Sequence, residues 1–384
     1  AWTLGGTHPY TDGVEMPLPI EPHGRTEFQT FSGQVTSQRP QVEVVRFDPH
    51  AAPNHSRLTL ILTPNLTGAL LGSLDYITGY PYGCVEQTTS RYLADLMVQK
   101  TFKGNSPLQP EEMQKMVKAG IKRIFEMQNK EKGTWGWWRY DEANLWMTAY
   151  ALYGLAEAKA QGYAVPEQML TLAKSGVKAL LDKPTQENAD PQKEYYAMVL
   201  YAFAKLGDSE IYNRYRPTLR LDGMSTEALA YLFFADRLFG KEDKAVIKRI
   251  DSRRISKRDM NFWQSQVGTF ESDITTTAMA LRVLIARKPN DPKILPTLRW
   301  LMYKRTGTYW VSTRDTLAVL AALGDYLQTQ PSFSPMGEVV VRVNGKEIQR
   351  VPVSASDRTA ELKVKIPLNV LQPEKNDVTL ERVG

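Results

Sequence analysis

The middle of the chain repeats one kind of segment, and this repetition limits the folds open to it. Six stretches begin with small or hydroxyl residues and carry apolar residues at helical spacing. They cover residues 89–98, 148–158, 196–207, 226–238, 277–286 and 316–327. More polar, amphipathic stretches lie between them, and the one at 110–128 has an apolar face made of Met113, Met116, Val117, Ile121 and Ile124. Apolar inner helices alternating with amphipathic outer helices predict an α/α toroid of six hairpins, with an open helical solenoid as the competing shape.

Short β-type stretches lie on both sides of this helical middle. Residues 39–47 and 56–64 alternate partly between apolar and polar side chains. After the helices, residues 338–353 contain Asn344-Gly345 between two alternating runs, which predicts a type I′ hairpin. The two ends could form separate small β domains or one sandwich interrupted by the helices. We favour the interrupted sandwich, because each end alone would bury little apolar surface.

Composition excludes several classes of protein. Hydrophobic residues make up 42% of the 384 residues and charged residues 23%, which suits a chain with a sizeable core. The sequence contains no run of about 18 apolar residues, so we expect no transmembrane helix. A net charge of +6 is a mild excess, and the basic run at 248–258 is typical of a solvated helix face or loop. We therefore expect no nucleic-acid partner.

The numbers and positions of cysteine and histidine exclude several kinds of metal-binding and catalytic site. Cys84 is the single cysteine, so the chain can form neither an internal disulfide nor a metal site of several cysteines. The four histidines are His8, His23, His50 and His55, and all of them precede the cysteine. This pattern excludes H-E-x-x-H zinc chemistry and argues against an ordinary Cys-His or Ser-His-Asp centre. We expect no metal and no cofactor.

The cysteine lies in the string YPYGCVEQTTS at 80–90, directly before the first repeated segment. Cys84 and Gln87 are three residues apart and can meet across one helical turn, where the thiol can displace the ammonia of the carboxamide and close an internal thioester. Gly83 would let the backbone pass close to the ring that the thioester bond closes. A helix N-terminus would favour the thiolate leaving group by about 0.3–1 kcal/mol. The plainer alternative is a buried structural cysteine near a helix start.

Glu86 belongs to the same string and has two possible roles. It could act as a local base, or it could orient the loop. We favour the structural role, because a carboxylate in the first turn is a common feature of helix starts.

The whole string at 80–90 resembles the thioester motif of bacterial alpha-2-macroglobulins, relatives of the animal macroglobulins and complement thioester proteins. Residues 65–84, 133–158 and 298–323 also resemble stretches of that family, so the resemblance covers nearly the whole chain. In that family the thioester lies in an α/α-toroid domain inserted in a CUB-like antiparallel β-sandwich. The resemblance thus implies an α+β multidomain chain: 1–65 and 331–384 as halves of the CUB-like domain, and 66–330 as the thioester-containing toroid. It implies Cys84 and Gln87 as the thioester pair, within a motif and loop that comprise Tyr82, Gly83, Val85 and Glu86.

The resemblance also implies a function. Members of the family trap proteases: cleavage of a bait region elsewhere in the protein exposes the thioester, which then tethers the protease through an amine. The chain would be a fragment of a single-turnover covalent protease inhibitor, not of an enzyme. Its partners would be target proteases and the remaining macroglobulin domains. The full protein would lie in the bacterial periplasm or cell envelope and could be membrane-anchored upstream.

The positions of the histidines indicate which nucleophile, an amine or a hydroxyl, would attack the thioester. In some complement-type relatives a downstream histidine first takes the acyl group and directs it to hydroxyls. No histidine follows Cys84 here. We therefore expect direct aminolysis to be preferred over transfer to hydroxyls.

Aromatic loops precede several of the repeated segments. In a closed toroid these loops would share the face that carries Cys84, where some of them could shield a thioester from water. The candidates are Tyr80, Trp135, Trp137, Trp138, Trp263, Tyr309 and Trp310. The alternative is that the tryptophans plug helix ends, as large aromatic residues often do.

Two other functions remain open. The helical part could be a non-covalent interaction module of the cell envelope in which the thioester is absent or hydrolysed. It could also be a glycan-active toroid enzyme that uses Asp141 and Glu142. Adjacent acids in one loop rarely have the opposed geometry that glycoside hydrolysis needs, so the enzyme is the weaker alternative.

Overall fold

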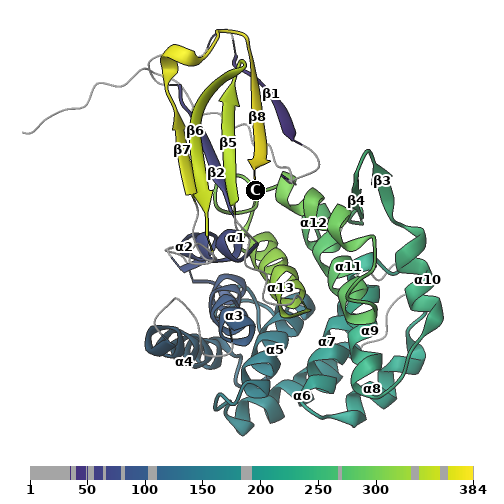
Figure 1. Cartoon of the computed structure of the whole chain (residues 1–384). Coiled ribbons are helices and arrows are strands. Elements are labelled where there is room, and N and C mark those ends of the chain that lie inside the picture. The colour runs from purple at the N-terminus through teal and green to yellow at the C-terminus, as the bar shows by residue number, and fades with distance from the viewer. Residues whose placement is uncertain are drawn as a thin grey trace, which may run out of the picture.

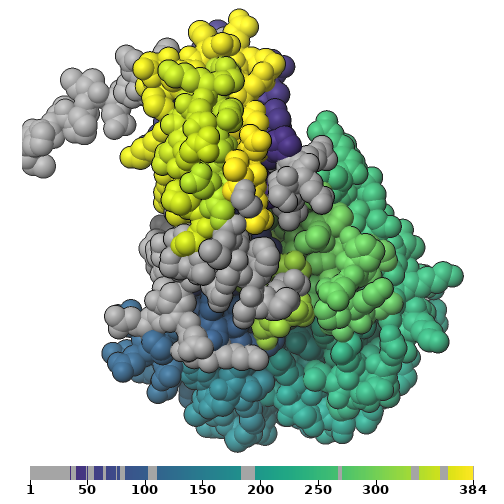
Figure 2. Space-filling view, viewed as in Figure 1, coloured from purple at the N-terminus to yellow at the C-terminus, as the bar shows by residue number. Residues whose placement is uncertain are grey.

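The computed structural model describes residues 35, 40–48, 50, 56–63, 66–78, 83–102, 110–182, 193–266, 270–329, 337–354 and 362–383. Within these residues the chain is a helix-rich α+β protein with antiparallel sheets, as the sequence predicts at this coarse level. Helices form the lower part of the molecule in Figure 1, and strands from both ends of the chain gather above them. The same division is visible on the surface in Figure 2.

Six of the described helices pack in a closed ring. They are α3 (Val85–Phe102), α5 (Leu145–Ala160), α7 (Lys193–Lys205), α9 (Thr226–Leu238), α11 (Asp273–Arg287) and α13 (Thr313–Thr329). Each helix contacts the next one in this series, and α13 packs back against α3. Each also overlaps one of the six repeated segments, so the prediction of helices at these positions is confirmed.

A second set of helices lies outside the ring. It contains α4 (Pro110–Met127), α6 (Glu167–Leu181), α8 (Ser209–Tyr215), α10 (Lys244–Ser252) and α12 (Ile294–Tyr303). Each of them packs against the ring helix that precedes it. The last ring helix, α13, is instead covered by α1 (Leu66–Gly72) and α2 (Leu74–Thr78), which come before the ring in the sequence.

Ring helices and outer helices differ in which of their residues are buried. In the ring helix α5, every residue from Leu145 to Ala158 is buried. The outer helix α4 buries a stripe that includes Met113, Val117 and Ile121 and exposes its charged face. Apolar side chains on all sides stabilise a helix only where neighbours surround it, whereas an amphipathic helix suits the periphery.

Tyr92 of α3 marks a close contact among three helices. Its ring is fully buried between Gly120 of α4 and Gly154 of α5. A Cβ atom at Gly154 would lie 2.2 Å from the Tyr92 Oη, and one at Gly120 would lie 2.6 Å from its Cδ1. Glycine at both positions gives the tyrosine ring its space, and this brings α4 and α5 close to α3.

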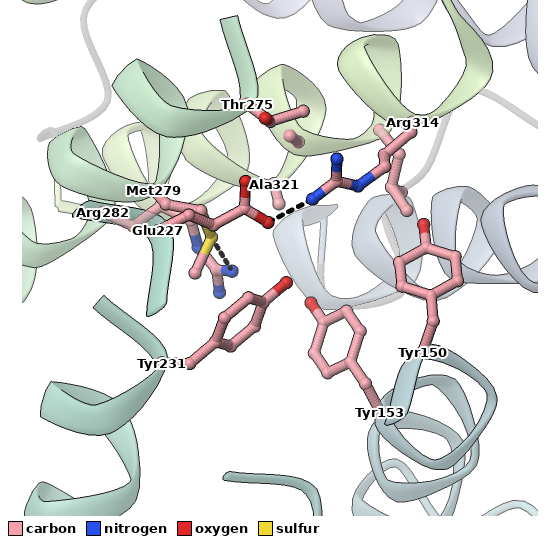
Figure 3. Close-up of a pocket in the computed structure, with 11 residues that line it drawn as sticks. Tyr150, Tyr153, Glu227, Tyr231, Thr275, Met279, Arg282, Arg314 and Ala321 are labelled. Carbon is pink, nitrogen blue, oxygen red and sulfur yellow. Dashed lines mark hydrogen bonds and ion pairs between the residues drawn. The ribbon is translucent and has the colours of Figure 1, made fainter. Parts of the chain in front are cut away.

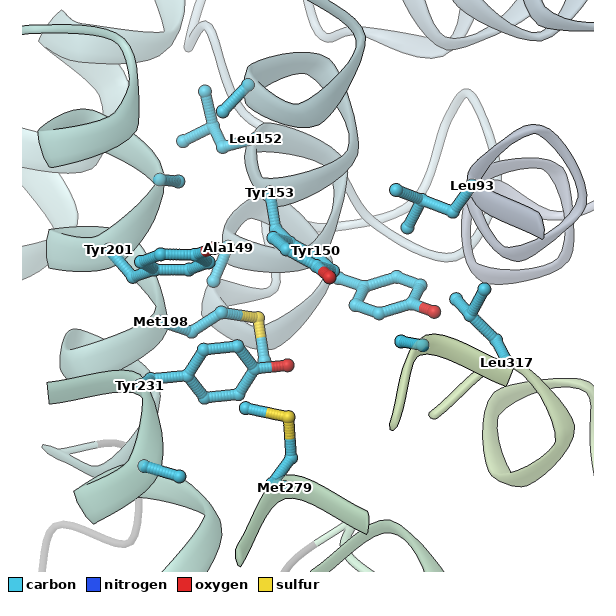
Figure 4. Packing of buried hydrophobic residues seen from close by; sticks show 14 of the residues in the cluster. Leu93, Ala149, Tyr150, Leu152, Tyr153, Met198, Tyr201, Tyr231, Met279 and Leu317 are labelled. Atoms are coloured by element: carbon cyan, nitrogen blue, oxygen red, sulfur yellow. The ribbon is translucent and has the colours of Figure 1, made fainter. Parts of the chain in front are cut away.

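The inner side of the ring carries tyrosines and charged groups among apolar side chains. Tyr153, Tyr201 and Tyr231 come from successive ring helices and lie together with Met198 and Met279 (Figure 4). Ion pairs bridge neighbouring ring helices there, with Lys205 Nζ 3.0 Å from Glu157 and Arg282 Nε 2.7 Å from Asp325. Pairing of this kind offsets the cost of burying charged groups.

Strands from the two ends of the chain pair with each other. A four-stranded antiparallel sheet has the order β1-β8-β5-β6, with β1 (Gln41–Arg46), β5 (Gly337–Val343), β6 (Lys346–Val353) and β8 (Lys375–Val383). A second pair joins β2 (Leu58–Leu62) to β7 (Leu362–Ile366). Side chains from both sheets share one small core that includes Val45, Val341 and Val364.

The predicted hairpin is present in the four-stranded sheet. Strands β5 and β6 are joined by Asn344 and Gly345, which have φ angles of 51° and 80°. Positive φ at both central residues is the requirement of a type I′ turn, so this prediction is confirmed.

The basic run at 248–258 lies at the end of α10 and in a short hairpin of β3 (Ile255–Lys257) and β4 (Met260–Phe262). Lys248, Lys257 and Arg258 in this run are exposed. The run therefore forms a solvated helix face and loop, as the sequence indicates.

Candidate functional site

Cys84 directly precedes α3 and is buried, with 5% of its surface exposed. Its carbonyl accepts the first helical hydrogen bond, at 2.9 Å from the Thr88 amide. The Gln87 amide lies 3.5 Å from the Cys84 Sγ, and the Cys84 amide donates to the Gln87 Oε1 at 3.4 Å. The backbone amide of each residue therefore contacts the side chain of the other across the first turn of the helix.

The acidity of the thiol reflects two opposing effects. Burial raises the pKa of Cys84, and the nearby charge of Glu86 acts in the same direction. The backbone amide of Gln87 at the helix start lowers the pKa, which is the effect that the sequence led us to expect. Burial outweighs it, so the pKa of the Cys84 thiol lies above its usual value in this structure.

Both neighbours of Cys84 are held by backbone hydrogen bonds to the α4–α5 hairpin. The carbonyl of Gly83 accepts from the Arg123 guanidinium of α4, at 3.1 Å from Nε and 2.8 Å from Nη2. The amide of Val85 donates to the carbonyl of Trp137 at 3.0 Å, in the loop that joins α4 to α5. The backbone at Cys84 is thus fixed on both sides by a single supersecondary unit.

Glu86 turns away from the thiol toward α13. Its carboxylate accepts hydrogen bonds from Ser90 at 2.7 Å and from Thr313 at 3.0 Å. Burial raises the pKa of Glu86, while these two hydrogen bonds and the charge of Arg314 act in the opposite direction. These contacts tie the start of α3 to the start of α13, which suits the orienting role we favoured.

The network continues from the helix starts into the ring. Ser90 also hydrogen-bonds the Tyr150 hydroxyl at 2.8 Å. Arg314, the residue after Thr313, forms an ion pair with Glu227 and lies over the Trp146 ring at 5.2 Å. Figure 3 shows the Arg314–Glu227 pair at the edge of a pocket inside the ring, facing Tyr150, Tyr153 and Tyr231.

Three of the candidate tryptophans share one buried arrangement. Trp135, Trp263 and Trp310 are fully buried. The indole Nε1 of each donates to a carbonyl of the preceding outer helix, and the backbone amide of each donates to a threonine of the following ring helix. The carbonyl partners are Ile124, Ile250 and Leu301, and the threonines are Thr148, Thr277 and Thr316. These contacts are those of helix plugs, the alternative to shielding.

Among the candidate aromatics that the structure describes, Trp137 has a backbone hydrogen bond to the Cys84 segment, through its carbonyl. Its side chain is 37% exposed, and it packs at 6.0 Å from Trp146 and at 5.8 Å from Phe270. Trp138 is 50% exposed, and its amide donates to the Asp141 carboxylate at 2.9 Å.

The remaining aromatics of the prediction lie elsewhere. Tyr309 is half-buried and stacks on Tyr76 of α2, with 4.0 Å between the ring centroids. Tyr80 and Tyr82 fall outside the described residues.

Sequence reasoning missed Arg123, Thr313 and Phe270. Arg123 lies 40 residues from its carbonyl partner, on the polar face of an outer helix, and Thr313 lies 227 residues from Glu86. Phe270 belongs to an exposed loop before α11. Packing of α4 on α3 brings Arg123 to the site, and closure of the ring brings Thr313 there, so no local pattern could have identified them.

Neither a metal site nor a membrane span was found within the part of the chain that the structure describes. Its His, Cys, Asp and Glu side chains form no cluster of three that could hold a metal ion. Its helices include none long and apolar enough to cross a membrane.

Comparisons with known proteins agree on one group of relatives. The family described as the A-macroglobulin TED domain matches residues 61–175. The alpha-2-macroglobulin of Thermotoga maritima is 25% identical over 261 residues, which is 67% of this chain and 15% of the relative. That of Escherichia coli K12 is 27% identical over 286 residues, which is 67% of this chain and 16% of the relative. This chain thus spans about a sixth of the length of these relatives or less.

Solved structures give the same picture of the fold. The native conformation of Escherichia coli alpha-2-macroglobulin has a TM-score of 0.59 at 18% identity, covering 89% of this chain and 22% of that one. A crystal structure of a Salmonella alpha-2-macroglobulin mutant has a TM-score of 0.57 at 19% identity, covering 89% of this chain and 23% of that one. At these identities the likeness is one of fold.

Proposed function

We propose that the chain contains a thioester-domain region of the bacterial macroglobulin type, and that Cys84 and Gln87 form an internal thioester in it. The observation that carries this proposal is the reciprocal contact of the two residues across the first turn of α3. In the closing reaction the Cys84 sulfur bonds to the side-chain carbonyl carbon of Gln87, and ammonia leaves with the thiol proton. Burial of Cys84 favours persistence of the bond, because a thioester survives only where water is kept away.

The proposed chemistry is acyl transfer to an amine. The nitrogen of an attacking amine bonds to the Gln87 carbonyl carbon, the carbon–sulfur bond breaks, and the proton released by the amine neutralises the Cys84 thiolate. The products are an amide and a free thiol. Since no histidine follows Cys84 in the sequence, we expect direct attack by amines, with hydroxyls as poorer acceptors.

In the full protein this reaction would trap proteases. Bait cleavage elsewhere would expose the thioester, and a lysine of the protease would be captured once, which makes the protein an inhibitor without turnover. Because the chain spans about a sixth of its relatives' length or less, the other macroglobulin domains are proposed partners alongside the proteases. We further propose the periplasm or cell envelope of a bacterium as its location.

We also propose a division into domains. Residues 66–330 would form the α/α toroid, supported by the closed ring of helices and their outer partners. Residues 1–65 and 331–384 would form the two halves of a CUB-like sandwich, supported by the pairing of β1 with β8 and of β2 with β7. Among the aromatic residues, the contacts around Trp137 favour it as a shield of the thioester.

The two alternatives make different predictions. A non-covalent module would keep the fold but show a free thiol and an intact Gln87. The glycan enzyme is disfavoured, because the Asp141 carboxylate accepts a hydrogen bond from the Trp138 amide within its own turn.

Intact mass measured before and after methylamine treatment tests the proposal, with Cys84→Ala as the control. We expect the native mass to be lower by one ammonia, and methylamine to raise it by one methylamine while releasing one thiol. Glycerol should react far more slowly. A native mass equal to that of the sequence, with a free thiol and no response to methylamine, would refute the thioester. Equal labelling by glycerol would refute the preference for amines.

A further inference from the structure

We propose that Arg123 is a positioning residue for Cys84: its guanidinium holds the Gly83 carbonyl and keeps the thiol in register with Gln87. This inference rests on the proposed thioester but concerns a residue outside its motif. Arg123 lies on the exposed face of α4, yet two of its nitrogens converge on one backbone oxygen 40 residues away. A planar guanidinium can present two parallel donors in this way, whereas a lysine ammonium is a single point charge.

The absence of a side chain at Gly83 leaves space for the Arg123 guanidinium. A Cβ atom at residue 83 would lie 2.9 Å from the Arg123 Nη2 and 3.1 Å from its Nε and Cζ. The close approach of the guanidinium supplies a reason for the missing side chain.

The second half of the arrangement is the bond from the Val85 amide to the Trp137 carbonyl. Cys84 lies between this bond and the one to Arg123, and both partners belong to the α4–α5 hairpin. Because the backbone is fixed on both sides of Cys84, its sulfur stays at the distance from the Gln87 side chain that the thioester requires. Loss of the Arg123 bonds would release the side of Cys84 that leads back to α2, and water would reach the sulfur and the carbonyl more often.

The test compares five forms of the full chain with the wild type: Arg123→Ala, Arg123→Lys, Gly83→Ala, the double variant Gly83→Ala/Arg123→Ala, and Lys122→Ala as a matched control. Lys122 is a neighbouring exposed cation on α4 whose ion pair with Glu126 is long, at 3.9 Å. The rate of thioester hydrolysis is followed by intact mass. Charge-assisted hydrogen bonds of this kind predict hydrolysis about three to ten times faster for Arg123→Ala, a smaller change for Arg123→Lys and none for Lys122→Ala.

Gly83→Ala disturbs the same contact, because the new Cβ atom would displace the Arg123 guanidinium. It should speed hydrolysis like Arg123→Ala, and the double variant should be no faster than the faster single variant, because both remove one interaction. The thermal unfolding temperatures of these variants should match those of the wild type and of Lys122→Ala, since the contact is exposed. Additive effects of the two substitutions would overturn the proposal, as would a hydrolysis rate for Arg123→Ala equal to that of Lys122→Ala.

A second readout separates this inference from the thioester itself. If the wild type carries a free thiol, the proposed function fails, but alkylation of Cys84 by iodoacetamide still reports its exposure. Each alkylation is unambiguous, because the chain has one cysteine. Arg123→Ala should then be alkylated several times faster than wild type and Lys122→Ala. Equal alkylation rates would overturn the positioning role independently of the thioester.

Discussion

Replacing Gly154 by alanine should loosen α3, the helix that begins directly after Cys84. A Cβ atom at residue 154 of α5 would lie 2.2 Å from the Tyr92 Oη, 2.7 Å from the Thr89 Cγ2 and 2.9 Å from the Tyr92 Cζ. Tyr92 has little room to retreat, since Gly120 of α4 lies close to the base of its ring, near Cβ, Cγ and Cδ1. The clash must therefore be relieved by moving α3 and α5 apart.

The expected magnitude is a difference of two opposing effects. Alanine in place of glycine inside a helix stabilises it by about 1 kcal/mol. Overpacking in a core with no free space costs about 3 kcal/mol at the upper end of its usual range. We expect the free energy of unfolding to fall by about 2 kcal/mol, measured by urea denaturation followed through tryptophan fluorescence.

The double variant Gly154→Ala/Tyr92→Phe identifies the clash as the cause. Tyr92→Phe removes the closest atom but leaves the contacts at Thr89 and Cζ, so it should restore about half of the lost stability. Because α3 begins next to Cys84, Gly154→Ala should also speed thioester hydrolysis. A Gly154→Ala variant more stable than wild type would refute this reasoning, as would a double variant no better than the single one.

Two further predictions concern the charged groups behind the site. Glu86→Gln keeps an acceptor for Ser90 and Thr313 but removes a carboxyl whose pKa burial raises above its usual 4.5. The folded wild type holds that proton more tightly than the unfolded chain, so its stability relative to the variant should fall as the pH rises above 4.5; urea denaturation at a series of pH values that shows a constant difference would exclude this linkage. Arg314→Leu should destabilise the protein by about 3–5 kcal/mol, because it leaves Glu227 buried without its partner. The double variant with Glu227→Leu should recover much of this in the same assay, and an equally unstable double variant would contradict the explanation.

Local patterns made much of the architecture predictable. Apolar residues at helical spacing marked the ring helices, because neighbouring helices surround them and bury most of their residues. Asn344-Gly345 marked a turn whose backbone angles few other residue pairs adopt. A spacing of three residues at a helix start also made the contact between Cys84 and Gln87 predictable, whereas the thioester bond itself stays a prediction.

Other parts of the site depend on contacts that no local pattern encodes. The sequence placed Trp135 and Trp137 in one loop as candidate shields with equal weight. Packing separates them: the Trp135 indole donates to the Ile124 carbonyl and is fully buried, whereas Trp137 is partly exposed and its carbonyl holds Val85. The orienting partners of the site reach it through helix packing: Arg123 through the contact of α4 with α3, and Thr313 through the contact of α13 with α3 that closes the ring.

The pairing of the first and last strands sets an order on folding. Gln41 pairs with Leu380, and Leu58 pairs with Ile366, so both pairings span the whole helical ring. During synthesis from the N-terminus, β1 and β2 emerge before the ring helices and cannot complete their sheets until β7 and β8 have been synthesised. The ring helices, by contrast, can pack on their neighbours as they appear, through contacts of short sequence separation. Segments 41–46 and 58–62 thus offer unpaired strand edges while the ring helices are being synthesised, and a chaperone that binds extended chains would be expected to recognise these segments during that time.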